Sequence, residues 1–325
     1  MNPNKFTEKF EVRLIRAAIQ ETHKLINAGF TTVMDAGGII GIYVRNAINE
    51  GIMPGPRILA SGRYISQTCG HGDTHYIPLD WAKDNKPMGW WPADGRIADG
   101  VDECITAVRE QFRLGCDFIK ILTGGGLGSP FDPPQYPQYT DEELTPMIKI
   151  SHSWGRKVMC HAHYPETIIS AVNAGADLIT HCTYADENAI KIMKEKNTIV
   201  VPTMANGYHR DPSKSLDNIK QLYDAGLTLA LGTDILGYPL GFEHNAIEFE
   251  AYVKKIGVTP QEAIKIGTLN CAKAMGRNDI GTIEPGKIAD IIAVKGNIMD
   301  RIDILQNANN IKCVIKDGAI LKNTL

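Results

Sequence analysis

The sequence has no segment typical of a protein that crosses a membrane or is exported. Its apolar runs fall short of the roughly 18 residues that a transmembrane helix needs, and the opening MNPNKFTEKFEVRL holds no apolar segment of the signal-peptide type. The seven cysteines are an odd number without any CxxC spacing, which favours reduced thiols over a disulfide framework. These absences predict a cytoplasmic protein with no membrane partner.

Charge of one sign is not in excess either. The chain has 34 Lys and Arg against 37 Asp and Glu, which gives a formal net charge of −3. This balance offers no case for binding nucleic acid or an anionic membrane. The glycine-rich TGGGLGSP (123–130) lacks the Gly-Lys-Ser/Thr ending of a phosphate-binding loop. We therefore expect a small molecule as the ligand.

What is present is an alternation of strand-like and helix-like patterns, which favours a parallel sheet with crossover helices. Apolar, β-branched runs occupy 31–38, 57–65, 118–122, 157–163, 178–182, 198–205 and 228–234. Helical patterns occupy 8–28, 100–114, 141–154, 165–174, 186–196, 215–225, 245–256 and 260–275. The prediction is an α/β fold with a TIM-like (β/α)8 barrel, of which seven strands, one short of a closed eight, are recognised.

Two regions depart from this alternation. Residues 66–99 hold three of the four tryptophans with several Pro and Gly, and a loop of that length inside a compact domain is usually functional. After residue 276 the pattern changes to short strands separated by Gly and Pro turns. We therefore predict a barrel domain over 1–276 and a small β portion over 277–325.

Four residues of interest stand where strand-like runs end: Lys120, His161, His181 and Asp234. In a parallel α/β barrel the carboxyl ends of the strands form the active face, so these four side chains would surround one cavity. One Lys, two His and one Asp in that position indicate a metal-dependent hydrolase. Simpler interpretations stay open: a buried ion pair between Lys120 and Asp234, histidines satisfied in the core, or an Asp that caps a turn.

Six motifs in order carry a resemblance to a known family. They are AGFTTVMDAGG, DFIKILTGGG, HAHYPETIISAVNAGADLITH, LGTD, GTLNCAKAMG and IGTIEPGKIADIIAV. Over residues 25–320 the chain resembles the amidohydrolase superfamily, in its imidazolonepropionase-like and Xaa-Pro dipeptidase branch. The resemblance implies a (β/α)8 barrel with a small β-sandwich. It also implies hydrolysis of an amide-type C–N bond, in a peptide, an N-acyl amino acid or a cyclic amide, by attack of metal-activated water.

The resemblance assigns roles to these residues. Lys120 would be carboxylated by carbon dioxide, and its carbamate would bridge two metal ions. His161 and His181 would ligate a metal, with zinc as the default ion. Asp234 would ligate a metal, take a proton from the attacking water and pass it to the leaving group. His163 falls nearer the substrate.

Further residues are candidates for contact with the substrate. His71 follows a glycine in the 66–99 loop, where the family often has Gly-His. Tyr164 stands where relatives often carry Gly. Arg210 follows a strand end and would pair with a substrate carboxylate, as in a dipeptidase or carboxypeptidase, because guanidinium binds carboxylate bidentately; a solvated surface arginine is the alternative. His75 with His71 is a weaker metal-binding alternative.

Family members also carry a His-x-His strand before the first element recognised here, and it supplies two ligands to the more buried metal. Without that strand, the remaining ligands predict at most one tightly bound metal, at the His161–His181 position. The alternative function is an incomplete, non-catalytic barrel subunit or remnant that needs the missing segment. A barrel opened at this point exposes strand edges that invite pairing, and we expect a homo-oligomer.

Overall fold

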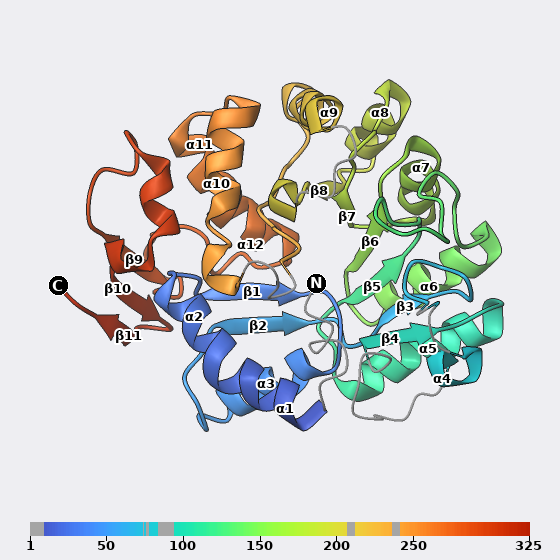
Figure 1. The fold of residues 1–325 in the computed structure, drawn as a ribbon, viewed down its shortest axis with the longest axis horizontal. Helices are drawn as coiled ribbons and strands as arrows, with labels where there is room; N and C mark the ends of the chain where they lie inside the picture. The colour runs from blue at the N-terminus through green and yellow to red at the C-terminus, as the bar shows by residue number, and fades with distance from the viewer. Residues whose placement is uncertain (1–9, 74, 76–77, 84–93, 207–211, 236–240) are drawn as a thin grey trace.

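The computed structural model describes residues 10–73, 75, 78–83, 94–206, 212–235 and 241–325 (Figure 1). Its central sheet has six strands in the order β4-β3-β5-β6-β7-β8, all paired in parallel. The strands are β3 (Tyr64–Ser66), β4 (Gly95–Ile97), β5 (Ile119–Leu122), β6 (Val158–Ala162), β7 (Leu178–His181) and β8 (Ile199–Val201). Helices cover the outer side of this sheet. The predicted α/β architecture is confirmed.

A second, two-stranded parallel sheet pairs β1 (Thr32–Asp35) with β2 (Arg57–Ala60). The predicted single strand over 57–65 is therefore wrong, because it is divided into β2 and β3 in different sheets. Gly62 stands at the division with a left-handed φ of 72° and forms an antiparallel bridge with Gly38. A strand cannot continue through that backbone conformation.

The 66–99 region is not one continuous loop. It contains the short helix α4 (Leu79–Lys83) and ends in β4. Strand β4 was not predicted, because it has only three residues and one of them is the buried Arg96. So short a segment shows no hydrophobic alternation. The partners of Arg96 are Glu103 and Glu110, which satisfy the guanidinium within the fold.

The run 228–234 is only partly strand-like. A single parallel bridge joins Leu229 to Val200 of β8, supported by hydrogen bonds from Val200 N to Thr228 O and from Ala230 N to Val200 O. Beyond Ala230 the chain leaves the sheet. The predicted strand is thus reduced to one contact beside β8, and Asp234 lies past it.

The helical predictions hold closely. The first predicted helix is α1 (Phe10–Arg16), η2 (Ala17–Glu21) and α2 (Thr22–Asn27) in succession. The others are α5 (Val101–Leu114), α6 (Asp141–Ser153), α7 (Pro165–Ala174), α8 (Glu187–Glu195), α9 (Pro212–Asp224), α10 (Ile247–Ala251) with η6 (Tyr252–Ile256), and α11 (Pro260–Lys265) with η7 (Ile266–Asn270) and α12 (Cys271–Ala274). A further helix, α3 (Ile40–Asn49), was not predicted from the sequence.

Two apolar layers flank the strands. The larger cluster packs the outer face of the central sheet against the helices and includes Ile121, Cys160 and Ile179. A smaller cluster lies on the opposite face, where alternate residues of β6, β7 and β8 pack with neighbouring residues and with Ala274 of α12. Its buried members are Phe118, Met159, Leu178, Ile199, Val201, Ala230 and Ala274. Strand residues that share this inner face point toward the candidate site described below.

The C-terminal part forms a separate antiparallel sheet, β11 (Ala319–Asn323), β10 (Ile311–Lys316) and β9 (Ile291–Val294) in that order. It packs beside α2 (Figure 1), where Ile26 joins the same apolar cluster as Ile311 and Val314. Helix α2, near the start of the described chain, therefore packs against the C-terminal sheet. All seven cysteines are free. None of the described helices combines the length and apolar character needed to cross a membrane.

Candidate metal centre and active site

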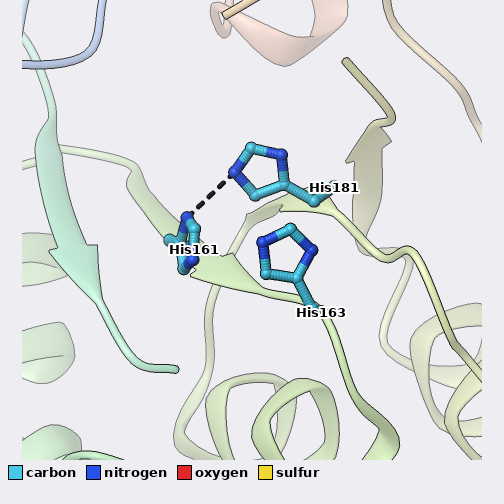
Figure 2. A group of neighbouring side chains, drawn as sticks. All are labelled: His161, His163 and His181. Atoms are coloured by element: carbon cyan, nitrogen blue, oxygen red, sulfur yellow. Dashed lines mark hydrogen bonds between the residues drawn. The ribbon is translucent and has the colours of Figure 1, made fainter. Parts of the chain in front are cut away.

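The strand register places two histidines on the inner face of the sheet. Met159 of β6 belongs to the inner cluster, whereas Cys160 packs in the outer one. Because side chains alternate along a strand, His161 continues the inward side, and His163, one residue past the strand, follows it. Figure 2 shows their rings gathered with that of His181.

His181 reaches this group only through an unusual backbone. It follows Ile179, an outer-face residue of β7, by two positions, so alternation alone would turn it outward. His181 and Cys182 adopt left-handed φ values of 76° and 51°, which costs about 1–3 kcal/mol each for non-glycine residues. The ring centroid of His181 consequently lies 4.5 Å from that of His161. Such strain concentrates at functional sites.

Hydrogen-bond partners determine which nitrogen of each ring carries a hydrogen. Thr203 donates its hydroxyl to the Pro202 carbonyl oxygen at 2.7 Å, so its Oγ1 accepts from Nδ1 of His181 at 2.6 Å. Nε2 of His161 lies 3.2 Å from the carbonyl oxygen of Gly125, which can only accept. Each neutral ring therefore turns an unprotonated nitrogen toward the other. His161 Nδ1 and His181 Nε2 are 2.9 Å apart.

Two facing lone pairs require positive charge between them. A proton would convert one ring to an imidazolium, but burial, followed by the neighbouring rings of His71 and His181, lowers the pKa of His161 well below its usual value. A divalent metal cation satisfies both nitrogens, since neutral imidazole is a common metal ligand. His161, His163 and His181 all bring ligand atoms within 4.8 Å of one another. The donor set fits a metal ion.

Lys120 lies in β5. Because it is two residues after Phe118, which belongs to the inner cluster, its side chain lies on the inner face of the sheet. Its Nζ donates to Oγ1 of Thr180 at 2.9 Å, and Thr180 donates in turn to the Cys160 carbonyl. Burial lowers the pKa of Lys120 to about 8, although the charge of Asp234 acts in the opposite direction. A substantial fraction of this amine is therefore neutral near physiological pH.

Asp234 is exposed and has a left-handed φ of 55°. The cluster of potential ligand atoms found among the described residues does not include it. The charge of Asp234 acts on Lys120, where it raises the pKa of the amine against the effect of burial. Next to it, Thr233 donates its hydroxyl to Asn245, which ties the end of the 228–234 run to the segment before α10.

His71 lies against the metal candidates from the turn that follows β3. Its ring stacks on that of His161, with centroids 4.4 Å apart and planes at 26°. Its Nδ1 is 2.8 Å from Oδ2 of Asp132, a carboxylate with only 1% of its side-chain surface exposed. Nε2 of His75 lies 3.8 Å from the other oxygen of Asp132. One buried carboxylate thus stands between two imidazoles.

The glycine-rich run after β5 makes this packing possible. A Cβ on Gly126 would lie 2.1 Å from Cε1 of His71, and one on Gly125 would lie 2.1 Å from the backbone oxygen of Asp132. The N–H of Gly126 donates to Oδ2 of Asp132 at 2.8 Å. The TGGG sequence is explained by close approach to protein atoms rather than to a phosphate.

The remaining candidates for substrate contact differ in position. His163 stacks on His181, with centroids 4.5 Å apart, and its Nδ1 is 2.8 Å from Oγ1 of Thr183. Tyr164 precedes α7, and its ring centroid lies 4.7 Å from that of Tyr184. Arg210 lies outside the described residues.

Sequence reasoning missed the residues that support these side chains. Thr180 and Thr203 hydrogen bond to Lys120 and His181, and Asp132 holds His71. For Thr180 a signal existed, because its place two residues after Leu178 in β7 puts it on the inner face. For Asp132 the sequence held no comparable signal; the residue simply stands between a phenylalanine and two prolines, shortly after the glycine run.

Comparisons with known proteins give a consistent family assignment. A model described as the amidohydrolase family matches residues 17–321. The ochratoxinase of Aspergillus niger is 34% identical over 321 residues, which cover 90% of this chain and 66% of that protein. An imidazolonepropionase of a Geobacillus species is 26% identical over 259 residues, which cover 76% of this chain and 54% of that protein. The chain thus spans about two-thirds or less of the length of these relatives.

Solved structures agree. The crystal structure of A. niger ochratoxinase superposes with a TM-score of 0.86 at 32% identity, covering 96% of this chain and 75% of that one. A Xaa-Pro dipeptidase with methionine bound in its active site gives the same TM-score and identity, covering 97% of this chain and 80% of that one. The similarity extends through the strands that carry the histidines.

Proposed function

The chain belongs to the amidohydrolase family, and from that premise we propose that it is a metal-dependent hydrolase of amide-type C–N bonds in small molecules. One observation carries the proposal: the unprotonated nitrogens of His161 and His181 face each other at 2.9 Å. A metal ion ligated by both nitrogens accounts for this arrangement, because neutral imidazole is a common metal ligand.

Four residues would hold the metal. His161 through Nδ1 and His181 through Nε2 would be two ligands, and Thr203 favours the tautomer of His181 that carries its hydrogen on Nδ1. Lys120 and Asp234 would complete the set with oxygens. Zinc is the default ion for such a mixed N/O set, with manganese or cobalt as alternatives. When bound, the ion would polarise the substrate carbonyl and acidify a water molecule.

Lys120 would enter this set as a carbamate. Its neutral amine attacks carbon dioxide, a C–N bond forms, and one proton is released as the N-carboxylate appears. The reaction needs the uncharged amine, which burial favours by lowering the pKa of Lys120 to about 8. The hydroxyl of Thr180, 2.9 Å from Nζ, keeps the nitrogen oriented. The carbamate would also replace a buried cation by an anion able to ligate a metal.

Asp234 would carry the proton. Its carboxylate would accept a proton from the attacking water and donate it to the nitrogen of the leaving amine, which balances the cleavage. An exposed position at the edge of the site is suited to a group that must exchange protons. His71, His163, Tyr164 and Arg210 would contact the substrate around this point.

The relatives suggest which compounds to test. One is an ochratoxinase and another a Xaa-Pro dipeptidase, so the panel should include ochratoxin, Xaa-Pro dipeptides, other dipeptides, N-acyl amino acids and lactams. Arg210→Lys should raise KM for carboxylate-bearing substrates more than for their amides, because Lys does not grip a carboxylate bidentately.

Metal content and activity measured together test the function. Purified protein supplemented with zinc and bicarbonate should retain metal after dialysis and hydrolyse at least one member of the panel. Asp234→Asn should keep the metal bound by the histidines yet lose most of the activity, and equal activity would remove the role given to Asp234. Protein that retains no metal and hydrolyses nothing would instead support a non-catalytic barrel.

A further inference from the structure

We propose that Asp132 is a positioning residue that holds His71 in one tautomer and one orientation, so that Nε2 of His71 is presented to the substrate. This inference rests on the proposed hydrolase function for its kinetic consequence, but its structural part stands alone. It assigns a role to a buried carboxylate that neither the metal nor the packing of the fold requires.

The hydrogen-bond directions lead to the tautomer. A carboxylate can only accept, and Oδ2 of Asp132 accepts both from the N–H of Gly126 and from Nδ1 of His71, each at 2.8 Å. Nδ1 of His71 therefore carries a hydrogen whether the ring is neutral or charged. None of the described residues hydrogen bonds to Nε2 of His71. Nε2 is consequently the ring nitrogen that can exchange a hydrogen with a substrate.

The ring plane is held as well as the tautomer. His71 stacks on His161 at a centroid distance of 4.4 Å, and Gly126 leaves no Cβ to push it away. The main-chain N–H of His71 donates to Oε1 of Gln138 at 3.0 Å, so the turn itself is tied to the loop that carries Asp132. These contacts fix His71 directly beside a proposed metal ligand.

Burial of Asp132 argues for a functional reason to keep it. Its side chain is 1% exposed, and a buried carboxylate is costly unless it is paired. Oδ1 has no hydrogen-bond partner, and neither does the buried Nε2 of His75 that lies 3.8 Å away. The N–H of Gly126 needs an acceptor here, but an uncharged amide oxygen would serve it as well as a carboxylate. Orientation of the His71 imidazole for proton exchange explains why a carboxylate stands at this buried position.

The test uses three variants of the full chain loaded with zinc. Asp132→Leu removes both acceptor oxygens at similar volume, whereas Asp132→Asn retains one oxygen that can accept from Nδ1. Asp73→Asn is the matched control, because the Asp73 side chain accepts from the N–H of Cys69 in the same turn, whereas the hydrogen bonds of His71 go to Gln138 and Asp132. Long-range proton–nitrogen NMR of histidine side chains reads the tautomer, with the His71 signals assigned by their loss in His71→Gln.

The expected result is a His71 with hydrogen on Nδ1 in the wild type, Asp132→Asn and Asp73→Asn, and a mixture of tautomers in Asp132→Leu. On a hydrolysed substrate, Asp132→Leu should lower kcat/KM by about 100-fold at unchanged metal content, as loss of a partner that orients a site histidine typically does. Asp132→Asn should restore most of that loss.

Two results would overturn the inference: an unchanged His71 tautomer in Asp132→Leu, or equal losses of kcat/KM in Asp132→Leu and Asp73→Asn. Absence of hydrolysis by the wild-type protein would instead defeat the proposed function, and the NMR measurement would still decide whether Asp132 positions His71.

Discussion

Nζ of Lys120 donates to Oγ1 of Thr180 across 2.9 Å, inside the central sheet. The two residues come from β5 and β7, which are separated in the sheet by β6, the strand that carries His161. A fully buried amine with a hydroxyl acceptor is poised between its charged and neutral forms. Several properties of the protein should depend on that balance.

The stability of the protein should depend on pH through Lys120. Its pKa is about 8 in the folded protein against 10.5 for an ordinary lysine, so between these values the unfolded chain binds more protons than the folded one. The contribution of Lys120 to stability therefore rises with pH from about 8 to about 10.5, by roughly 3 kcal/mol in total.

Urea unfolding of metal-free, bicarbonate-free protein against Lys120→Met measures this contribution. Subtracting the variant removes the titration of other groups. A difference in the free energy of unfolding that stays flat across this window would contradict the low pKa of Lys120.

Thr203→Val should weaken metal binding. The substitution keeps a β-branched side chain at the left-handed position, φ 56°, but removes the hydroxyl that accepts from Nδ1 of His181. With its tautomer no longer fixed, His181 should bind metal about 10- to 100-fold more weakly. Zinc titration with a competing chelator measures the change. Thr183→Val, which removes the partner of His163 instead, is the control and should alter affinity far less.

Glu248→Gln should destabilise the segment that follows β8. The buried Glu248 accepts from the N–H groups of Met204 and Ala205, each at 2.8 Å. An amide presents an NH2 to one of these donors and leaves it unpaired, at a cost of about 1–3 kcal/mol. Chemical unfolding measures the cost, and a variant as stable as wild type would show that water or a rearranged backbone replaces the contact.

The same residue gives a second pH effect of opposite direction. Burial raises the pKa of Glu248 from 4.5 to about 8, so the folded protein binds more protons than the unfolded chain between these values. The wild type should therefore lose stability relative to Glu248→Gln as pH rises from about 4.5 to about 8. Unfolding curves of both proteins at pH 5, 6.5 and 8 test the sign.

Gly126→Ala should displace His71 without unfolding the protein. The new Cβ would lie 2.1 Å from Cε1 of the His71 ring, a side chain that can swing away into solvent. Misplacement of a substrate-contacting group by about 1 Å can cost about 100-fold in rate. Kinetics of the zinc-loaded variant measure the effect. Gly124→Ala is the comparison, since the atoms nearest its Cβ would belong to Thr167, the closest at 3.0 Å.

Local sequence patterns predicted most of the order of elements and the strands on which His161 and Lys120 lie. Period-2 alternation in β6 places His161 on the same face as Met159, and the apolar run of β5 places Lys120 beside it. These features are local, because backbone pleat and side-chain burial act over a few residues. The helix over 165–174 was predicted from the same kind of local spacing and matches α7.

Only the tertiary structure decided how His181 and His71 join the site. His181 follows an outer-face position, and left-handed backbone at His181 and Cys182 turns it inward, a conformation that its contacts with Thr203 and His161 stabilise. His71 depends on Asp132, 61 residues away. The division of 57–65 into two strands likewise follows from the bridge between Gly62 and Gly38. These outcomes rest on contacts between residues distant in the chain. Hydrophobic periodicity reflects only neighbouring residues, so it cannot predict such contacts.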